Sequence, residues 1–149
     1  MEDERTMNEA QASAAGSLFH IVSDKAVPEV IETIRANAPK FGFHVRHVFD
    51  MRREYEQHGI EVFHDFDLCH IMVCNMRGSF NSMKHNMERA AVIYQPKQIT
   101  VFSDNGGTKV NYFPLSQRCI AEALPSDVGF QKSLHQACLN IVDMIKASV

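Results

Sequence analysis

The sequence lacks the motifs that most readily identify an enzyme. It contains no GxGxxG dinucleotide-binding pattern, no Walker phosphate loop, no GxSxG nucleophile elbow, no HExxH zinc motif and no pair of CxxC motifs. Any functional site must therefore have a weaker sequence signature than these classes provide.

Long apolar runs and an excess of positive charge are also missing. No stretch approaches the ~20 apolar residues that would cross a bilayer. The formal net charge is -3, so no overall basic field attracts a phosphate backbone, and we expect neither a nucleic-acid partner nor a membrane partner. Residues 1–16 are polar, without the apolar segment of a secretory signal. We therefore expect a cytoplasmic protein whose four cysteines are reduced thiols.

Length and composition indicate one globular domain. The chain has 149 residues, of which 45% are hydrophobic and 22% are charged. At this size a folded chain buries roughly two thirds of its unfolded surface, so one core suffices. Residues 1–16 show no apolar periodicity and are expected to form a flexible N-terminal leader, and residues 17–149 to form a single α/β domain.

Strand-like and helix-like patterns alternate along this domain. Strands are expected at 17–22, 41–49, 68–75 and on both sides of the turn Asn105-Gly106-Gly107, which indicates a β-hairpin. Helical spacing is found in 26–41, 51–57, 78–89 and 128–147. We expect Ser23 or Asp24 to cap the first helix. The order predicts an α+β fold: a two-layer α/β sandwich with a four- to five-stranded mixed sheet, helices mostly on one face and a long C-terminal helix.

The strand LCHIMVCN, residues 68–75, contains the most unusual side chains. Period-two geometry places His70, Met72 and Cys74 on one face, and Cys69 on the other with the branched apolar residues. An imidazole, a thioether and a thiolate suit copper, zinc or haem iron. The alternative is that the sulfur side chains fill a core and that His70 bonds to a backbone group.

Other histidines extend this candidate site. His20, His44, His70 and Cys74 would form a metal or haem site if their strands were neighbours in matching register. By the same period-two geometry, His44 and His47 are expected on opposite faces of one strand. Scattered histidines that make ordinary hydrogen bonds are the alternative.

The junction after this strand allows a different chemistry. Cys74 and Asn75 directly precede an expected helix, and the positive end of a helix dipole favours a thiolate. Cys74 could therefore be the nucleophile of a thiol or redox enzyme, activated by His70 or by the helix N-terminus.

The segment from Val27 to Ser116 resembles domain-of-unknown-function family 302. A helix ends before FGFHV, a strand ends in Cys74-Asn75, and Pro96 opens a strand that leads to the NGG hairpin. The resemblance implies a compact two-layer α/β domain that can form homodimers, and it implies no settled activity.

The resemblance can be carried over at individual positions. Gly42 matches the glycine after the first helix, Cys74 begins the element that is Cys-Asn-Pro in the family, and Pro96 begins its Pro-Cys element. Met76 and Lys97 stand where the family commonly has the proline and the second cysteine. Any partnership between two cysteines in relatives is therefore missing here.

These observations support one leading hypothesis and two alternatives. The leading hypothesis is a non-enzymatic ligand-binding or sensing domain, a homodimer, that holds a metal ion, haem or another small ligand. Its ligand-binding residues would be His70, Met72, Cys74 and Asn75. The first alternative is a thiol or redox enzyme that uses Cys74. The second is a dimeric protein-interaction module whose open sheet face is the interface.

Overall fold

The computed structural model describes residues 17–149, and the leader expected at 1–16 lies outside the described residues. Within that part of the chain the strands are β1 (Phe19–Ser23), β2 (His44–Asp50), β3 (Leu68–Cys74), β4 (Gln98–Asp104) and β5 (Gly107–Tyr112). The helices are α2 (Val27–Asn37), α3 (Met51–Gln57), α4 (Met76–His85), α5 (Ala90–Ile93), α6 (Gln117–Ala123) and α7 (Val128–Lys146). Two 3-10 turns, η1 (Ala38–Phe41) and η2 (Met87–Arg89), complete the order.

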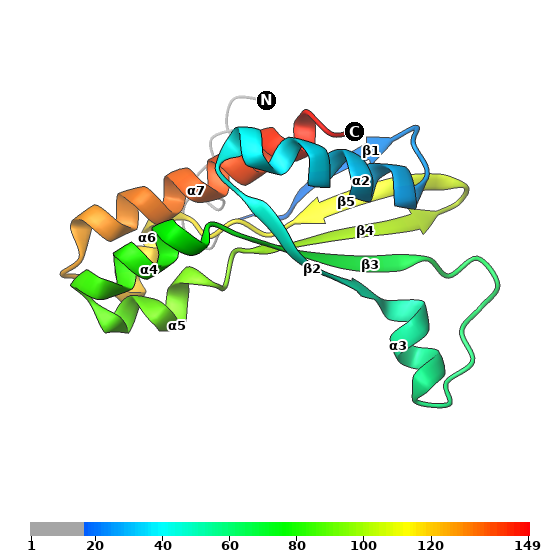
Figure 1. The fold of residues 1–149 in the computed structure, drawn as a ribbon, viewed down its shortest axis with the longest axis horizontal. Coiled ribbons are helices and arrows are strands. Elements are labelled where there is room, and N and C mark those ends of the chain that lie inside the picture. The colour runs from blue at the N-terminus through cyan, green and yellow to red at the C-terminus, as the bar shows by residue number, and fades with distance from the viewer. Residues whose placement is uncertain (1–16) are drawn as a thin grey trace, which may run out of the picture.

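The strands form one open sheet in the order β1-β5-β4-β3-β2 (Figure 1). The expected α+β fold, with its long C-terminal helix, is confirmed. The expectation of a mixed sheet was wrong, because every neighbouring pair is antiparallel. The reason is visible in Figure 1: α3 and the α4–α5 segment extend beyond the ends of the strands, so the chain re-enters the sheet at the end it left.

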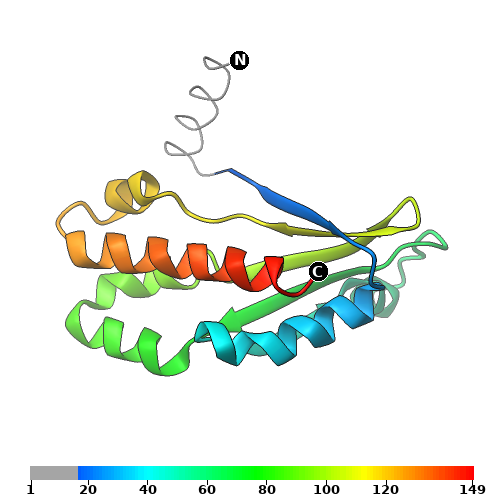
Figure 2. The ribbon, with the colours of Figure 1, turned by 90° about the horizontal axis from the view of Figure 1, so that it is seen from above.

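Two helices, α2 and α7, lie side by side over one face of the sheet (Figures 1 and 2). Their apolar residues recur at helical spacing and meet the inward residues of the central strands. The main core includes Val30 and Ile34 from α2, Ile71 from β3, and Ile141 and Met144 from α7. Burial of each such side chain contributes about 1.5–3 kcal/mol. Within residues 17–149, no helix covers the central strands on the opposite face of the sheet (Figure 1).

A β-bulge in β2 changes which histidines share a face. His44 pairs with Cys74 and His47 with Met72, with a register shift between Val45 and His47 that accommodates Arg46 as an extra residue. His44 and His47 therefore both lie on the open face. The expectation that they point to opposite faces was wrong, because strict period-two counting cannot include a bulge.

Local chemistry explains several other boundaries. The hairpin turns at Asn105 and Gly106, whose φ angles are 52° and 80°, as the sequence predicts. The expected cap at Ser23 or Asp24 was wrong, because α2 begins later, after Ala26, which has no side-chain cap. The helix expected over 78–89 is interrupted at Asn86, whose backbone is extended. None of the helices at 17–149 is long and apolar enough to cross a membrane.

Candidate functional site

Strand β3 divides its side chains as its sequence predicts. Cys69 is buried in the main core with Ile71 and Val73, and burial raises the pKa of its thiol to about 11. His70 and Met72 are half-buried on the open face. His70 Nδ1 lies 3.1 Å from Thr100 Oγ1 on β4, so its hydrogen-bond partner is a side chain and not a backbone group.

The four residues proposed as metal ligands are only partly brought together. His44 lies directly opposite Cys74. His20 is on β1, at one edge of the sheet, and is separated from the strand of His70 by β5 and β4. Within residues 17–149, no group of three or more His, Cys, Asp or Glu side chains is placed so that it could hold a metal ion.

The junction between β3 and α4 has the expected form, with Asn75 as the N-cap. Asn75 Oδ1 accepts a hydrogen bond from the Gly78 amide at 2.9 Å. Gly78 leaves room for this contact, since a Cβ there would lie 2.9 Å from Asn75 Cγ. Cys74 is only 1% exposed, and its Sγ donates to Met76 Sδ at 3.4 Å. The thiol is thus shielded rather than presented to a substrate.

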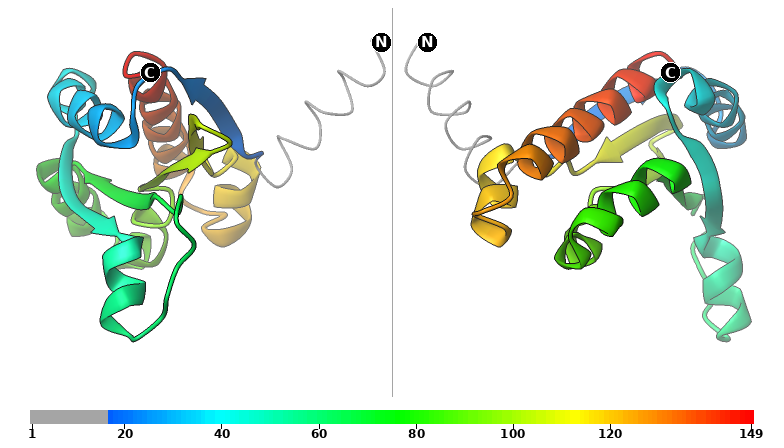
Figure 3. Two further views of the ribbon diagram at one scale, coloured as in Figure 1. Left: turned by 90° about the vertical axis from the view of Figure 1, so that its right-hand side faces the viewer. Right: turned by 60° about the vertical axis from the view of Figure 1, so that its left-hand side comes forward.

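A cleft of about 410 Å³ opens beside this junction. Its walls come from η1 and the residues after it, from the first turns of α4 and from α7, which runs alongside α4 (Figures 2 and 3). Apolar and uncharged polar side chains share the lining with one charged residue, Lys97. The apolar lining residues include Phe41, Phe43, Ile93, Phe130 and Leu134, and the polar ones Asn75, Ser79, Ser82, Ser133, Gln136 and Asn140.

Lys97 is largely buried, and its amine has no polar partner within residues 17–149. The residue is 6% exposed, and its Nζ lies 5.3 Å from the centre of the Phe43 ring. Among the described residues, Nζ makes neither an ion pair nor a hydrogen bond. Burial lowers the pKa of Lys97, and the neighbouring Cys138 and Cys74 act in the opposite direction. The amine keeps some access to the cleft, because the one fully buried side-chain nitrogen or oxygen without a partner in residues 17–149 is Asn111 Oδ1. An amine that has lost most of its water and has no protein partner is a candidate for contact with a ligand.

The backbone holds residue 97 in place. The Lys97 carbonyl accepts a hydrogen bond from the Val73 amide at 2.9 Å. Tyr112 Oη donates to the Pro96 carbonyl at 2.6 Å, and burial raises the pKa of this phenol, which keeps it a donor. Residue 97 is therefore fixed next to the end of β3, where Cys74 lies.

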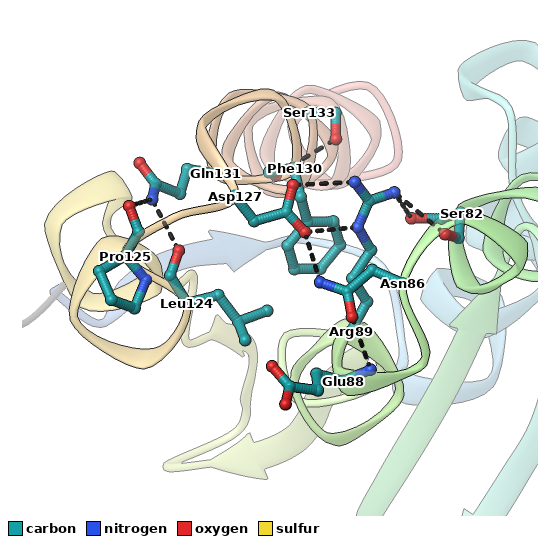
Figure 4. Close-up of polar contacts among 10 residues, drawn as sticks. All are labelled: Ser82, Asn86, Glu88, Arg89, Leu124, Pro125, Asp127, Phe130, Gln131 and Ser133. Carbon is teal, nitrogen blue, oxygen red and sulfur yellow. Dashed lines mark hydrogen bonds and ion pairs between the residues drawn. The ribbon is translucent and has the colours of Figure 1, made fainter.

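An ion pair joins the two walls of the cleft (Figure 4). Arg89 Nε and Nη2 donate to the Asp127 carboxylate at 2.7 and 2.8 Å, and Arg89 Nη1 donates to the Ser82 carbonyl at 3.0 Å. Asn86 also donates to Asp127, and the guanidinium lies 5.1 Å from the Phe130 ring centre. The Arg89 hydrogen bonds lower the pKa of Asp127 to about 2. Ser82 and Phe130 line the cleft, so this clamp connects residues of both walls.

A larger groove of about 880 Å³ lies at the other end of the sheet, beside the β4–β5 hairpin. Its lining includes Asp50, Asp67 and Asp104. The pKa of Asp67 is raised, mainly because the carboxyl group is partly buried and also because the negative charge of Asp50 is close. Its arginine, Arg52, is already engaged, donating to the Phe66 carbonyl at 2.6 Å. This acidic groove offers no buried, unpaired cation comparable to Lys97.

Sequence reasoning missed the cleft and its lysine. Lys97 was noticed only as a departure from the family pattern, and Phe43 only as a strand residue. The available signal was the position itself: a lysine directly after Pro96, where the family pattern commonly has its second cysteine. The packing of η1 and α7 around it has no signature in the sequence.

Comparison with known proteins identifies the family. A family model described as "Domain of unknown function DUF302" matches residues 19–146. The chain belongs to the DUF302 family. A crystal structure of an uncharacterized conserved protein DUF302 from Bacillus stearothermophilus matches with a TM-score of 0.70 and 14% sequence identity, covering 89% of this chain and 98% of that chain. This likeness shows a shared fold. No curated protein matches the sequence.

Proposed function

We propose that this DUF302 protein is a non-enzymatic ligand-binding domain that holds a small organic molecule in the cleft between η1, α4 and α7. The observation that carries the proposal is the largely buried Lys97, which lines this cleft and whose amine has no partner among the described residues. A buried cation is stabilised when a partner supplies opposite charge or hydrogen bonds. Ligand sites are typically concave, with apolar walls and a few polar groups, as this cleft is.

The test is a screen of small polar and charged fragments against isotope-labelled protein, read from amide shifts in NMR spectra. We expect hits to shift the amides of Gly42, Gly78 and Ala137, which line the cleft. Ala137→Phe should abolish these responses by filling the cleft, whereas Ala123→Phe, at an exposed position at the end of α6, should keep them. Hits that map elsewhere, or that survive Ala137→Phe, would contradict the proposal.

Metal or haem binding at the open sheet face is a second candidate. The observation in its favour is the bulge in β2, which puts His44 and His47 on the same face as His70 and Met72. Imidazole and thioether groups suit borderline and soft metals. The test is elemental analysis, haem titration and thermal melting, with His44→Ala/His47→Ala compared with the exposed His58→Ala. No bound metal, no Soret band and unchanged melting would refute this candidate.

The same face is our candidate for a homodimer interface. Val22 is 63% exposed there. A second copy would cover this apolar side chain and remove it from water. Light scattering should report a dimer that Val22→Glu dissociates and that Val128→Glu, at the start of α7, leaves intact. A monomeric wild-type protein would contradict this assembly.

A further inference from the structure

The charges around the cleft differ from those of the whole chain. The chain carries 18 acidic residues against 15 basic ones. Among the described residues, those that line the cleft nevertheless include Lys97 and no Asp or Glu. Asp127, at the edge of the clamp, already receives hydrogen bonds from Arg89 and Asn86. A positively charged ligand would therefore meet an unfavourable field in this cleft, and a negatively charged one a favourable field.

The start of α4 adds to this preference. Asn75, Gly78 and Ser79, in the first turn of this ten-residue helix, line the cleft. The N-terminus of a helix carries a partial positive charge that stabilises anions. The Gly78 and Ser79 amides already donate to Asn75, so the contribution here is the field of the helix end and not free amide groups. On α7, Asn140 Oδ1 accepts from Gln136 Nε2 at 3.0 Å, which leaves the Asn140 amide group to donate elsewhere. The lysine and this helix end border the same cleft.

The rest of the lining is apolar and partly aromatic. Phe41 and Phe43 come from the η1 side, and Phe130 and Leu134 from α7. An inorganic anion would leave these surfaces in contact with water. An organic anion with an apolar body would bury them, at about 25 cal/mol per Å² of apolar surface removed from water.

We infer that the ligand is an organic carboxylate with an apolar, preferably aromatic body, whose carboxylate pairs with the ammonium group of Lys97. This inference rests on the proposed ligand-binding function of the cleft. The carboxylate oxygens accept hydrogen bonds from Nζ, and the ring lies among the phenylalanine side chains. The association is non-covalent, so the only proton involved is the one that keeps the Lys97 amine charged.

Matched pairs of probes test the charge requirement. The probes are 3-phenylpropanoate with 3-phenylpropanamide, and benzoate with benzamide, because each pair differs in charge but hardly in shape. We expect the wild-type protein to bind each carboxylate about tenfold or more tightly than its amide, as charge-assisted hydrogen bonds give. In Lys97→Met, which keeps the length of the side chain, we expect this preference to vanish while the amides keep their affinity within about threefold.

A second measurement covers the case in which Lys97→Met does not fold. In wild-type protein with labelled lysines, 3-phenylpropanoate should shift the Lys97 side-chain resonance at concentrations about tenfold lower than 3-phenylpropanamide does. Equal affinity for acid and amide, or a preference that persists in Lys97→Met, would overturn the inference and leave ligand binding in the cleft intact. Failure of both carboxylates to perturb the cleft would also overturn it. Failure of the proposed function would instead appear as fragments that bind outside the cleft.

Discussion

The ammonium nitrogen of Lys97 lies 5.3 Å from the centre of the Phe43 ring, in a cleft to whose lining residues 17–149 contribute no carboxylate. The aromatic face partly compensates for the loss of water around the charge. It does not replace a charged partner or a hydrogen-bond acceptor. The free protein therefore tolerates an unfavourable arrangement that a suitable ligand would relieve.

Replacement of Lys97 by methionine should stabilise the free protein. Methionine fills the same volume without a charge to desolvate, so we expect the free energy of unfolding to rise by on the order of 1 kcal/mol, or the melting temperature by about 3 °C. Lys109→Met is the matched control, because Lys109 forms an exposed ion pair with Asp104 at 2.7 Å and its loss should cost about 0–1 kcal/mol. A Lys97→Met protein less stable than wild type would contradict the view that the amine is unpaired.

The extra stability of Lys97→Met should decrease as the pH rises. Burial lowers the pKa of Lys97 in the folded protein below its ordinary value of 10.5. At a pH between the folded-state pKa and 10.5, the unfolded chain therefore binds more protons than the folded one. Wild-type stability should therefore rise with pH in that window, and the advantage of Lys97→Met should shrink there. Urea denaturation at a series of pH values, with both proteins, provides the measurement.

The clamp between Arg89 and Asp127 should stabilise the fold above acidic pH. The Asp127 pKa is lowered from 3.8 to about 2, so its contribution is complete above pH 3.8 and is lost as the pH falls through about 2. Asp127→Asn should lower the urea midpoint at neutral pH, and the difference from wild type should narrow in acid. Asp104→Asn, which removes an exposed pair, should have a smaller effect. Equal effects of the two substitutions would contradict the role of the clamp.

Cys74 should react slowly with thiol reagents in the folded protein. It is 1% exposed, whereas Cys119 on α6 is partly exposed. Iodoacetamide labelling followed by peptide mass spectrometry should therefore modify Cys119 first, and Cys74 only when the protein unfolds. Rapid modification of Cys74 in the native state would instead favour the thiol or redox enzyme hypothesis.

Replacement of Gly78 by alanine should destabilise the protein, because it disturbs the Asn75 N-cap of α4. The Cβ of Gly78→Ala would displace the Asn75 side chain, and loss of this N-cap should cost about 1 kcal/mol. Gly129→Ala in α7 is the control, since its Cβ would meet nothing within 4 Å, and greater helix propensity should stabilise it by up to about 1 kcal/mol. Thermal melting of both variants distinguishes them, and a neutral Gly78→Ala would show that the cap is dispensable.

Much of the fold could be predicted because its signals are local. The hairpin depends on the positive φ angles of Asn105 and Gly106, and α7 depends on helical spacing of its apolar residues. The division of Cys69 from His70 on β3 likewise follows from period-two geometry. The direction of the strands was not predictable in this way, because it depends on where α3 and the α4–α5 segment leave the sheet.

The site was harder to predict for two physical reasons. A bulge shifts the side-chain alternation by one residue, so the shared face of His44 and His47 depends on the pairing of β2 with β3. The cleft depends on contacts between η1, α4 and α7, which are far apart in the sequence. In the sequence, Lys97 stands out only because the family commonly has a cysteine there. Its burial beside the cleft can be recognised only in the folded structure.

The most direct test of a ligand site at Lys97 is an NMR titration of its side-chain Cε resonance, with and without 3-phenylpropanoate. The titratable groups that face the amine are Cys74 and Cys138, and Tyr112 contacts Cys138, so the titration should also be followed in Cys138→Ala. We predict a pKa below the ordinary lysine value in the free protein, and a rise when 3-phenylpropanoate binds but not when its amide is added. A Lys97 that titrates like the exposed lysines, unchanged by either compound, would contradict the account.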